Sequence, residues 1–154
     1  MAHTMRVVVD FAGLSGNVTV AHIHGPTTTA FTGTASVATT TPTFPGFPSA
    51  VTSGSYDQTF DMTLTSSYRA GFITANGGTT AGAETALFTA IADGKAYLNV
   101  HSNTFPGGEI RGFFVLAPAP VPEIDPATGS SALSLVAGVL AMIEQRRRRA
   151  TLVV

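Results

Sequence analysis

The stretch YDQTFDMTLT, residues 56–65, shows the clearest alternation of apolar and polar side chains in the sequence. One parity carries Tyr56, Gln58, Phe60, Met62 and Leu64, and the positions of the other parity carry Asp and Thr. Because successive side chains of a strand point to opposite faces, this alternation predicts a β-strand with one apolar and one polar face. Further segments rich in β-branched and aromatic residues predict strands at 6–11, 17–24, 95–101 and 109–116.

Residues 82–92 break this alternation. Leu87 and Ile91 lie four positions apart, which is the spacing of one helix face, and Gly94 stands where a left-handed helix cap is common. We therefore expect a short helix over 82–92, packed on an edge or an end of the sheet.

Two other segments do not read as regular strands. Residues 67–78, SYRAGFITANGG, fit either a helical turn or a short strand. Residues 42–49, PTFPGFPS, contain three prolines, and proline removes the N–H group that a central strand needs. We expect residues 42–49 to form a long surface loop.

The composition changes after Leu116. APAPVPEIDP is rich in proline and predicts an extended linker, and the 17 residues that follow it, 127–143, carry no charge. A membrane span needs about 17 to 25 residues, and the arginine cluster behind this stretch fits the positive-inside rule. The alternative is a helix of small residues that docks on the domain. The predicted parts are a β-rich domain at 1–116, a linker at 117–126, and a transmembrane helix with a basic tail at 127–154.

Composition narrows the function classes. Only 11% of the residues are charged and the formal net charge is −1, so much of the solvent-exposed surface must be hydroxyl rather than ionic, which favours an extracellular all-β module. The chain has no cysteine, which excludes disulfides, thiolate metal sites and a cysteine nucleophile. Half of the eight basic residues lie in the run 146–149 and there is no tryptophan, so we expect no nucleic-acid partner.

The histidines are the candidate chemistry. His22 and His24, in HIHGP, point to the same side of a predicted strand, and a pair at this spacing can chelate one metal ion. His101 ends the predicted strand 95–101, so a three-histidine site forms if the two strands are neighbours. Three imidazoles suit Zn or Cu, and chemistry at the ion would need an open fourth position.

The alternative is that the histidines are structural and hydrogen-bond to the backbone or to Glu109 and Arg111. Glu109 and Arg111 share one strand face, which predicts an ion pair or a contact across strands. Asp57 and Asp61 lie on the solvent-exposed face of a predicted strand, which does not favour acid/base catalysis. The sequence contains neither a phosphate-binding loop nor a nucleophile elbow. We therefore expect no enzyme activity and no catalytic residue.

The C-terminal part resembles a PEP-CTERM sorting signal of the VPEID variant, in which a short box precedes a hydrophobic helix and an arginine cluster. The resemblance implies export through the bacterial inner membrane, a temporary membrane anchor, and cleavage near the box by an exosortase, a membrane-embedded cysteine protease. The matching residues are Val121, Pro122, Glu123, Ile124 and Asp125 in the box, 127–143 in the helix, and Arg146, Arg147, Arg148 and Arg149 in the cluster.

Residues 13–26, GLSGNVTVAHIHGP, and 95–112, KAYLNVHSNTFPGGEIRG, resemble the CHRD (chordin-type) domain family over about 6–116. The resemblance implies a mainly β fold, an antiparallel Greek-key β-sandwich of immunoglobulin-like or Cu/Zn superoxide dismutase-like type. The dismutases also hold copper with a His-x-His pair on a strand. Because the chain shows no fourth ligand, bridging histidine or cysteine pair, we expect no redox catalysis.

The N-terminus departs from the family pattern. Family members usually carry a hairpin before the strand at 6–11, and MAHTM has no apolar stretch of a signal peptide. We interpret this as a late start codon or a fragmented gene. If the chain is complete, the sandwich exposes unpaired backbone groups that invite strand donation from a neighbour, as in a filament.

The first functional hypothesis is an exported module of the bacterial surface or extracellular matrix that contacts proteins or polysaccharides. The second is a metal-binding domain that uses His22, His24 and His101 with Zn or Cu. The third is a self-assembling filament subunit.

Overall fold

Two antiparallel β-sheets form the framework of the fold. The computed structural model describes residues 3–117, and this range forms a compact unit that ends at Leu116. One sheet pairs β1 with β3, and the other has the order β2-β4-β5. The elements are β1 (Thr4–Phe11), β2 (Val18–His24), β3 (Gly54–Asp61), the 3-10 turn η1 (Thr65–Ser67), α1 (Ala70–Ala75), α2 (Thr80–Ala92), β4 (Tyr97–Ser102) and β5 (Ile110–Phe113).

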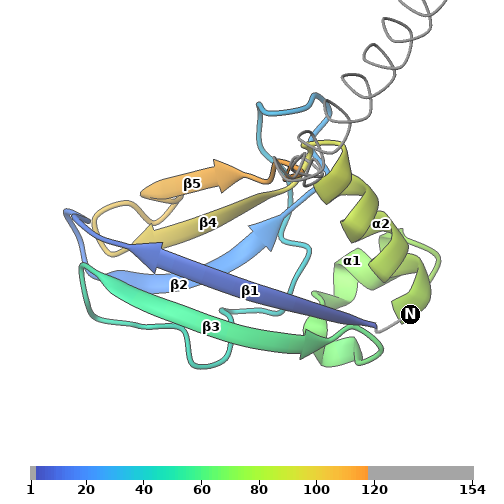
Figure 1. The fold of residues 1–154 in the computed structure, drawn as a ribbon, viewed down its shortest axis with the longest axis horizontal. Helices are drawn as coiled ribbons and strands as arrows, with labels where there is room; N and C mark the ends of the chain where they lie inside the picture. The colour runs from blue at the N-terminus through green and yellow to red at the C-terminus, as the bar shows by residue number, and fades with distance from the viewer. Residues whose placement is uncertain (1–2, 118–154) are drawn as a thin grey trace, which may run out of the picture. The chain divides into compact units, whose positions relative to one another are not determined.

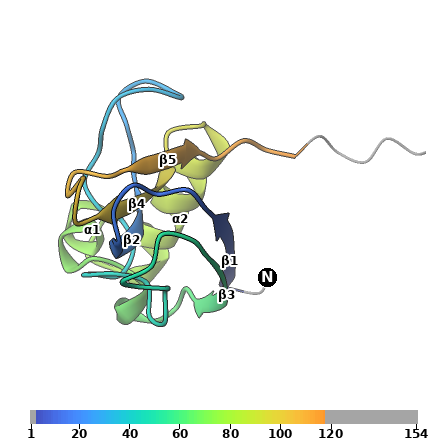
Figure 2. The same ribbon diagram turned by 90° about the vertical axis from the view of Figure 1, so that its left-hand side faces the viewer.

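The chain alternates between the two sheets from β1 to β4, and the sheets form two layers (Figures 1 and 2). Buried apolar side chains from both layers form the core. Val7 and Phe60 come from one layer, and Ile23 and Val100 come from the other; all four are buried. The predicted antiparallel β-sandwich is therefore confirmed.

The helices lie together at one end of the strands (Figure 1). Helix α2 begins beside Thr79, whose hydroxyl accepts a hydrogen bond from the Gly82 N–H at 3.1 Å, and ends near Gly94 at a φ of +66°. Leu87 is fully buried, so the predicted helix is confirmed. The segment that fitted either a helix or a strand forms α1, which gives the fold a second short helix.

Two predicted strands are longer than the observed ones. Strand β3 ends at Asp61 because the Asp61 carboxylate accepts hydrogen bonds from the N–H and the hydroxyl of Thr63, at 2.9 and 2.6 Å, and turns the chain. Met62 is fully buried beyond the end of the strand. Strand β5 covers only four residues of the predicted 109–116.

The predicted surface loop at 42–49 is wrong in one respect, because Phe44 is fully buried and Phe47 is 7% exposed. This segment follows the outer edge of β2, where the Phe44 N–H donates to the Ala21 carbonyl at 2.9 Å. Its prolines prevent a regular strand, yet its aromatic side chains fill the core beside Tyr56.

Threonine hydroxyls complete the hydrogen bonding of this β2 edge. The Thr39 hydroxyl accepts from the Ile23 N–H and the Thr43 hydroxyl accepts from the Ala21 N–H, both at 2.9 Å. Thr39 is fully buried, so its oxygen replaces the backbone partner that a neighbouring strand would supply.

Among residues 3–117, no helix has the length and apolar character needed to cross a membrane. The predicted hydrophobic helix at 127–143 lies outside the described residues.

Replacing Thr39 with valine should destabilise the domain by about 1–3 kcal/mol, because the buried Ile23 N–H loses its acceptor while the side-chain volume stays similar. Urea unfolding of residues 1–116 measures this change. Thr59→Val is the matched control, since Thr59 is exposed on β3. Equal midpoints for the two variants would contradict the assigned role of Thr39.

Candidate metal centre

The face of the β2-β4-β5 sheet that turns away from the core carries three histidines. In the register of β2 and β4, His22 lies opposite Asn99 and His24 lies opposite Tyr97. His101 follows two positions after Asn99, on the same face. The two strands are neighbours, as the three-histidine prediction required, and the structure brings all three predicted ligands together.

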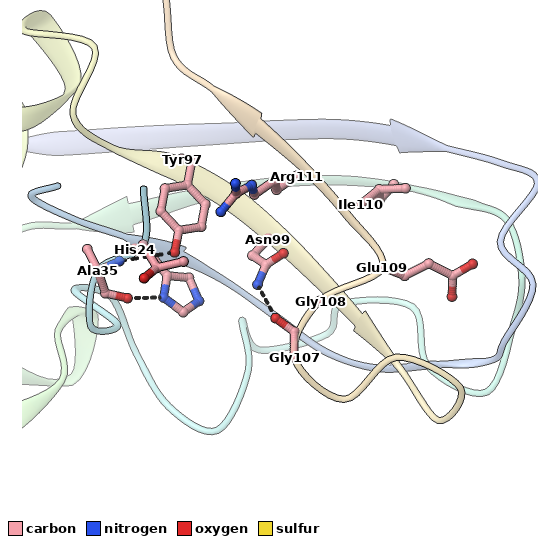
Figure 3. Close-up of a pocket in the computed structure, with 10 residues that line it drawn as sticks. His24, Ala35, Tyr97, Asn99, Gly107, Gly108, Glu109, Ile110 and Arg111 are labelled. Atoms are coloured by element: carbon pink, nitrogen blue, oxygen red, sulfur yellow. Dashed lines mark hydrogen bonds between the residues drawn. The ribbon is translucent and has the colours of Figure 1, made fainter. Parts of the chain in front are cut away.

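Two loops cover this face and orient two of the rings. The Nδ1 of His24 lies 2.8 Å from the Ala35 carbonyl (Figure 3), and the Nδ1 of His101 lies 2.7 Å from the Pro106 carbonyl. Because a carbonyl only accepts hydrogen bonds, each Nδ1 carries the hydrogen and each Nε2 presents a lone pair. Histidines that bind metals are commonly held in this way.

The three side chains form one tight group. Their ligand nitrogens all lie within 4.8 Å of one another. The centroid of the His22 ring lies 4.7 Å from the centroid of the His24 ring and 4.8 Å from that of the His101 ring. In a tetrahedral zinc site with Zn–N bonds of about 2.0–2.1 Å the nitrogens are about 3.4 Å apart, so side-chain shifts on the order of 1 Å would close the group around one ion.

Two buried nitrogens in the group have no hydrogen-bond partner among the described residues: the Nδ1 of His22 and the Nε2 of His24. Burying a polar atom without a partner costs about 1–3 kcal/mol. A metal ion would satisfy both atoms, so the residues present fit a transition metal.

The third ligand nitrogen is held differently. The Asn99 side-chain amide donates to the Nε2 of His101 at 3.1 Å and to the Gly107 carbonyl at 3.3 Å. A metal ion would have to displace the first of these bonds and would leave the second intact. Asn99 therefore holds the His101 lone pair in position within the group.

Burial favours the neutral form of His22 and His24. Desolvation, followed by the proximity of His24 and His101, lowers the pKa of His22 to about 4. Desolvation also lowers the pKa of His24, although the Ala35 carbonyl opposes this shift. Neutral imidazole is the form that binds a metal, so near neutral pH these two ligands do not have to release a proton first.

A hollow of about 370 Å³ beside the group connects it to the surface, and His24, Tyr97 and Asn99 line it (Figure 3). Arg111 stands at the same hollow, with its guanidinium 5.3 Å from the centre of the Tyr97 ring and one N–H donating to the Gly33 carbonyl at 3.0 Å. Of the three histidines, His24 lines this hollow, whereas His22 and His101 are buried beside it.

The expected ion pair between Glu109 and Arg111 is not found among the described residues. The Glu109 carboxylate instead accepts hydrogen bonds from the backbone N–H groups of Ser15 and Gly16 and points away from His24 (Figure 3). The alternative of a contact across strands is confirmed for Arg111 by its position over Tyr97, which lies on β4.

The alternative was that the histidines are structural and hydrogen-bond to the backbone or to Glu109 and Arg111. Only the hydrogen bonds to the backbone are observed. None of the three rings bonds to Glu109 or Arg111; two bond to loop carbonyls. The carbonyls of Ala35 and Pro106 carry no signal in the sequence, because any residue supplies a carbonyl and only the loop conformation brings it to the ring. The proximity of Asn99 to His101 could have been predicted from the sequence, because the two residues lie two positions apart on one strand and share a face.

The predicted sorting box, Val121 to Asp125, and the basic cluster, Arg146 to Arg149, lie outside the described residues. Comparison with known families nevertheless covers both ends of the chain. The CHRD domain matches residues 1–114, and the VPEID-CTERM protein sorting domain matches residues 121–151. No curated protein and no solved structure matches the chain. The sorting domain indicates an exported protein. Since the CHRD match covers most of the sequence, the chain belongs to the CHRD domain family and carries a VPEID-CTERM sorting domain behind it.

Proposed function

We propose that this chain is an exported bacterial surface protein whose CHRD domain binds one divalent transition-metal ion, Zn or Cu, through His22, His24 and His101. The observation that carries the proposal is that one ring nitrogen from each of the three histidines lies within 4.8 Å of the others. In the same group the buried Nδ1 of His22 and the buried Nε2 of His24 have no hydrogen-bond partner among the described residues.

The ligand chemistry supports Zn or Cu over Mg or Ca. Neutral imidazole is a borderline ligand that suits late first-row metals, whereas Mg and Ca prefer oxygen. Among residues 3–117, Glu109 supplies the only carboxylate that lines the hollow, and this carboxylate already accepts hydrogen bonds from Ser15 and Gly16. The described residues therefore offer three imidazole nitrogens at this place and no unengaged carboxylate.

The proposal assigns binding rather than catalysis. When bound, the ion would supply Lewis acidity at the end of the solvent-connected hollow. The chain's own residues hold the rings through Ala35 and Pro106 and cover the site with two loops. No described residue at the hollow offers a free carboxylate for proton transfer.

The sorting domain supports the proposed export to the bacterial surface. Its box lies in a proline-rich segment, which favours an extended backbone that a protease can bind, and the arginines hold the end of the apolar stretch in the cytoplasm. An exosortase-type protease then cuts near the box, after transient anchoring in the inner membrane, and the domain remains at the surface or in the matrix.

Contacts with extracellular proteins or polysaccharides are the second candidate function. The outer face of the β1–β3 sheet favours it, because this face exposes hydroxyl and carboxylate side chains that can hydrogen-bond to sugars and peptides. The exposed residues are Thr4, Asp10, Ser55, Asp57, Thr59 and Asp61.

Zinc or copper at 100 times its dissociation constant should stabilise residues 1–116 by about 2.7 kcal/mol, which corresponds to a rise of roughly 10 °C in the unfolding midpoint. Thermal unfolding with and without each metal measures the rise. His22→Ala, His24→Ala and His101→Ala should each abolish it, because the three ligands act on one ion.

His3→Ala is the matched control, because His3 is exposed and bonds to Glu84 outside the group. This variant should keep the full rise. A rise that survives in the three ligand variants but vanishes in the control would place the metal elsewhere and refute the site. Circular dichroism of each metal-free variant separates loss of binding from loss of folding.

Pro122→Ala combined with Glu123→Ala should block processing of the full chain in a host that has an exosortase, because both changes alter the box. Immunoblotting and mass spectrometry of the C-terminus compare it with the unaltered chain, which should be shortened near the box. Ala119→Ser is the control and should be processed normally. If the altered box is cut as efficiently as the native one, the sorting assignment fails.

A further inference from the structure

The edge of β1 that faces away from β3 has no strand beside it among the described residues. The Met62 N–H donates to the His3 carbonyl at 2.8 Å, so His3 and Met62 form a hydrogen-bonded pair of the antiparallel ladder. Hydrogen-bonded pairs alternate along such a ladder. The odd-numbered residues of β1 therefore bond to β3. The backbone groups of Arg6, Val8 and Asp10 point to the free edge.

Apolar hollows run along this free edge. One of about 300 Å³ lies between β1 and α2, and a second of about 250 Å³ lies between β1 and β5; both are lined by Val9 and Leu98. Val8 and Phe88 at the first hollow and Ile110 at the second expose 57%, 36% and 41% of their surface. Unpaired backbone groups beside exposed apolar side chains mark a site for strand pairing.

The charges on the β1 edge identify the partner. We propose that β1 pairs antiparallel with β1 of a second copy of this chain, with Val8 opposite Val8 on the two-fold axis. This register places Arg6 of each copy opposite Asp10 of the other. It also makes hydrogen-bonded pairs of the three residues whose backbone groups point to the edge.

Neighbouring symmetric registers are worse. A pairing centred on Arg6 would place two arginines opposite each other, and one centred on Asp10 would oppose two aspartates, which is unfavourable. A pairing centred between Arg6 and Val8 would leave each charge opposite an uncharged residue. Arg6 already bonds to Asp57 across the β1–β3 pair, so Asp10 of the second copy would complete a line of alternating charges.

The other strand edges are less suited to self-pairing. The free edge of β3 carries Asp57 and Asp61 together with Ser55 and Thr59, so two copies would bring carboxylates together. The outer edge of β2 is bonded by the segment that contains Thr39 and Thr43. Strand β5 has only four residues. The pairing is thus specific to β1 and closes after two copies, unlike a filament.

Cysteine cross-linking of the full chain tests the pairing. The chain has no native cysteine, so Val8→Cys introduces one thiol on the proposed axis. In mild detergent, which accommodates the apolar C-terminal stretch, a short bismaleimide should yield a dimer whose fraction rises with protein concentration. Thr59→Cys, exposed on the same face of β3, is the matched control and should remain monomeric. This experiment needs no metal, so its outcome is independent of the metal proposal.

Charge exchange tests the register. In the Val8→Cys chain, Arg6→Asp should weaken association about tenfold, because the exchange replaces two attractive pairs with repulsive ones. Adding Asp10→Arg should restore cross-linking by exchanging the charges across the axis. Any of four results would overturn the proposal. The Val8→Cys chain could stay monomeric, the Thr59→Cys chain could cross-link equally well, the double charge exchange could fail to restore the dimer, or the cross-linked product could contain another polypeptide.

Discussion

The register between β2 and β4 is the constraint on which the rest of the site depends. It places His22 beside Asn99 and brings His101 within reach of both histidines of β2. Because side chains alternate between the faces of a sheet, a slip of one residue in β2 would turn its histidines into the core and move Ile23 out of it. Core packing and site geometry are therefore specified by the same pairing. The buried Ile23 and Ala21 hold the register that the histidines need.

The sequence predicted the features that follow from periodicity. Alternation located β3, and the content of β-branched and aromatic residues located the other four strands. The four-residue spacing of Leu87 and Ile91 located α2, and the shared parity of His22 and His24 located two of the three histidines of the group. That His101 completes the group depended on a strand pairing that one sequence does not reveal. The family resemblance to the CHRD domain supplied the sandwich that makes this pairing natural.

What escaped prediction was mainly backbone chemistry. Asp61 ends β3 with a side-chain turn that no alternation rule detects, and the prolines at 42–49 concealed a segment whose phenylalanines complete the core. The carbonyls that orient His24 and His101 come from loops, and loop conformation depends on the assembled fold. The partners of Glu109 were missed for the same reason: its carboxylate bonds to a turn far away in the sequence.

The two carbonyls that hold His24 and His101 fasten the loops that contain Ala35 and Pro106 to one face of the sheet. An exported domain without cysteine has no disulfide with which to resist unfolding. A metal ion shared by β2 and β4 would join segments separated by most of the domain, and closing so long a loop removes much of the freedom of the unfolded chain. The histidine group would then act as a reversible staple, and the availability of metal outside the cell would set how long the exported domain survives proteases.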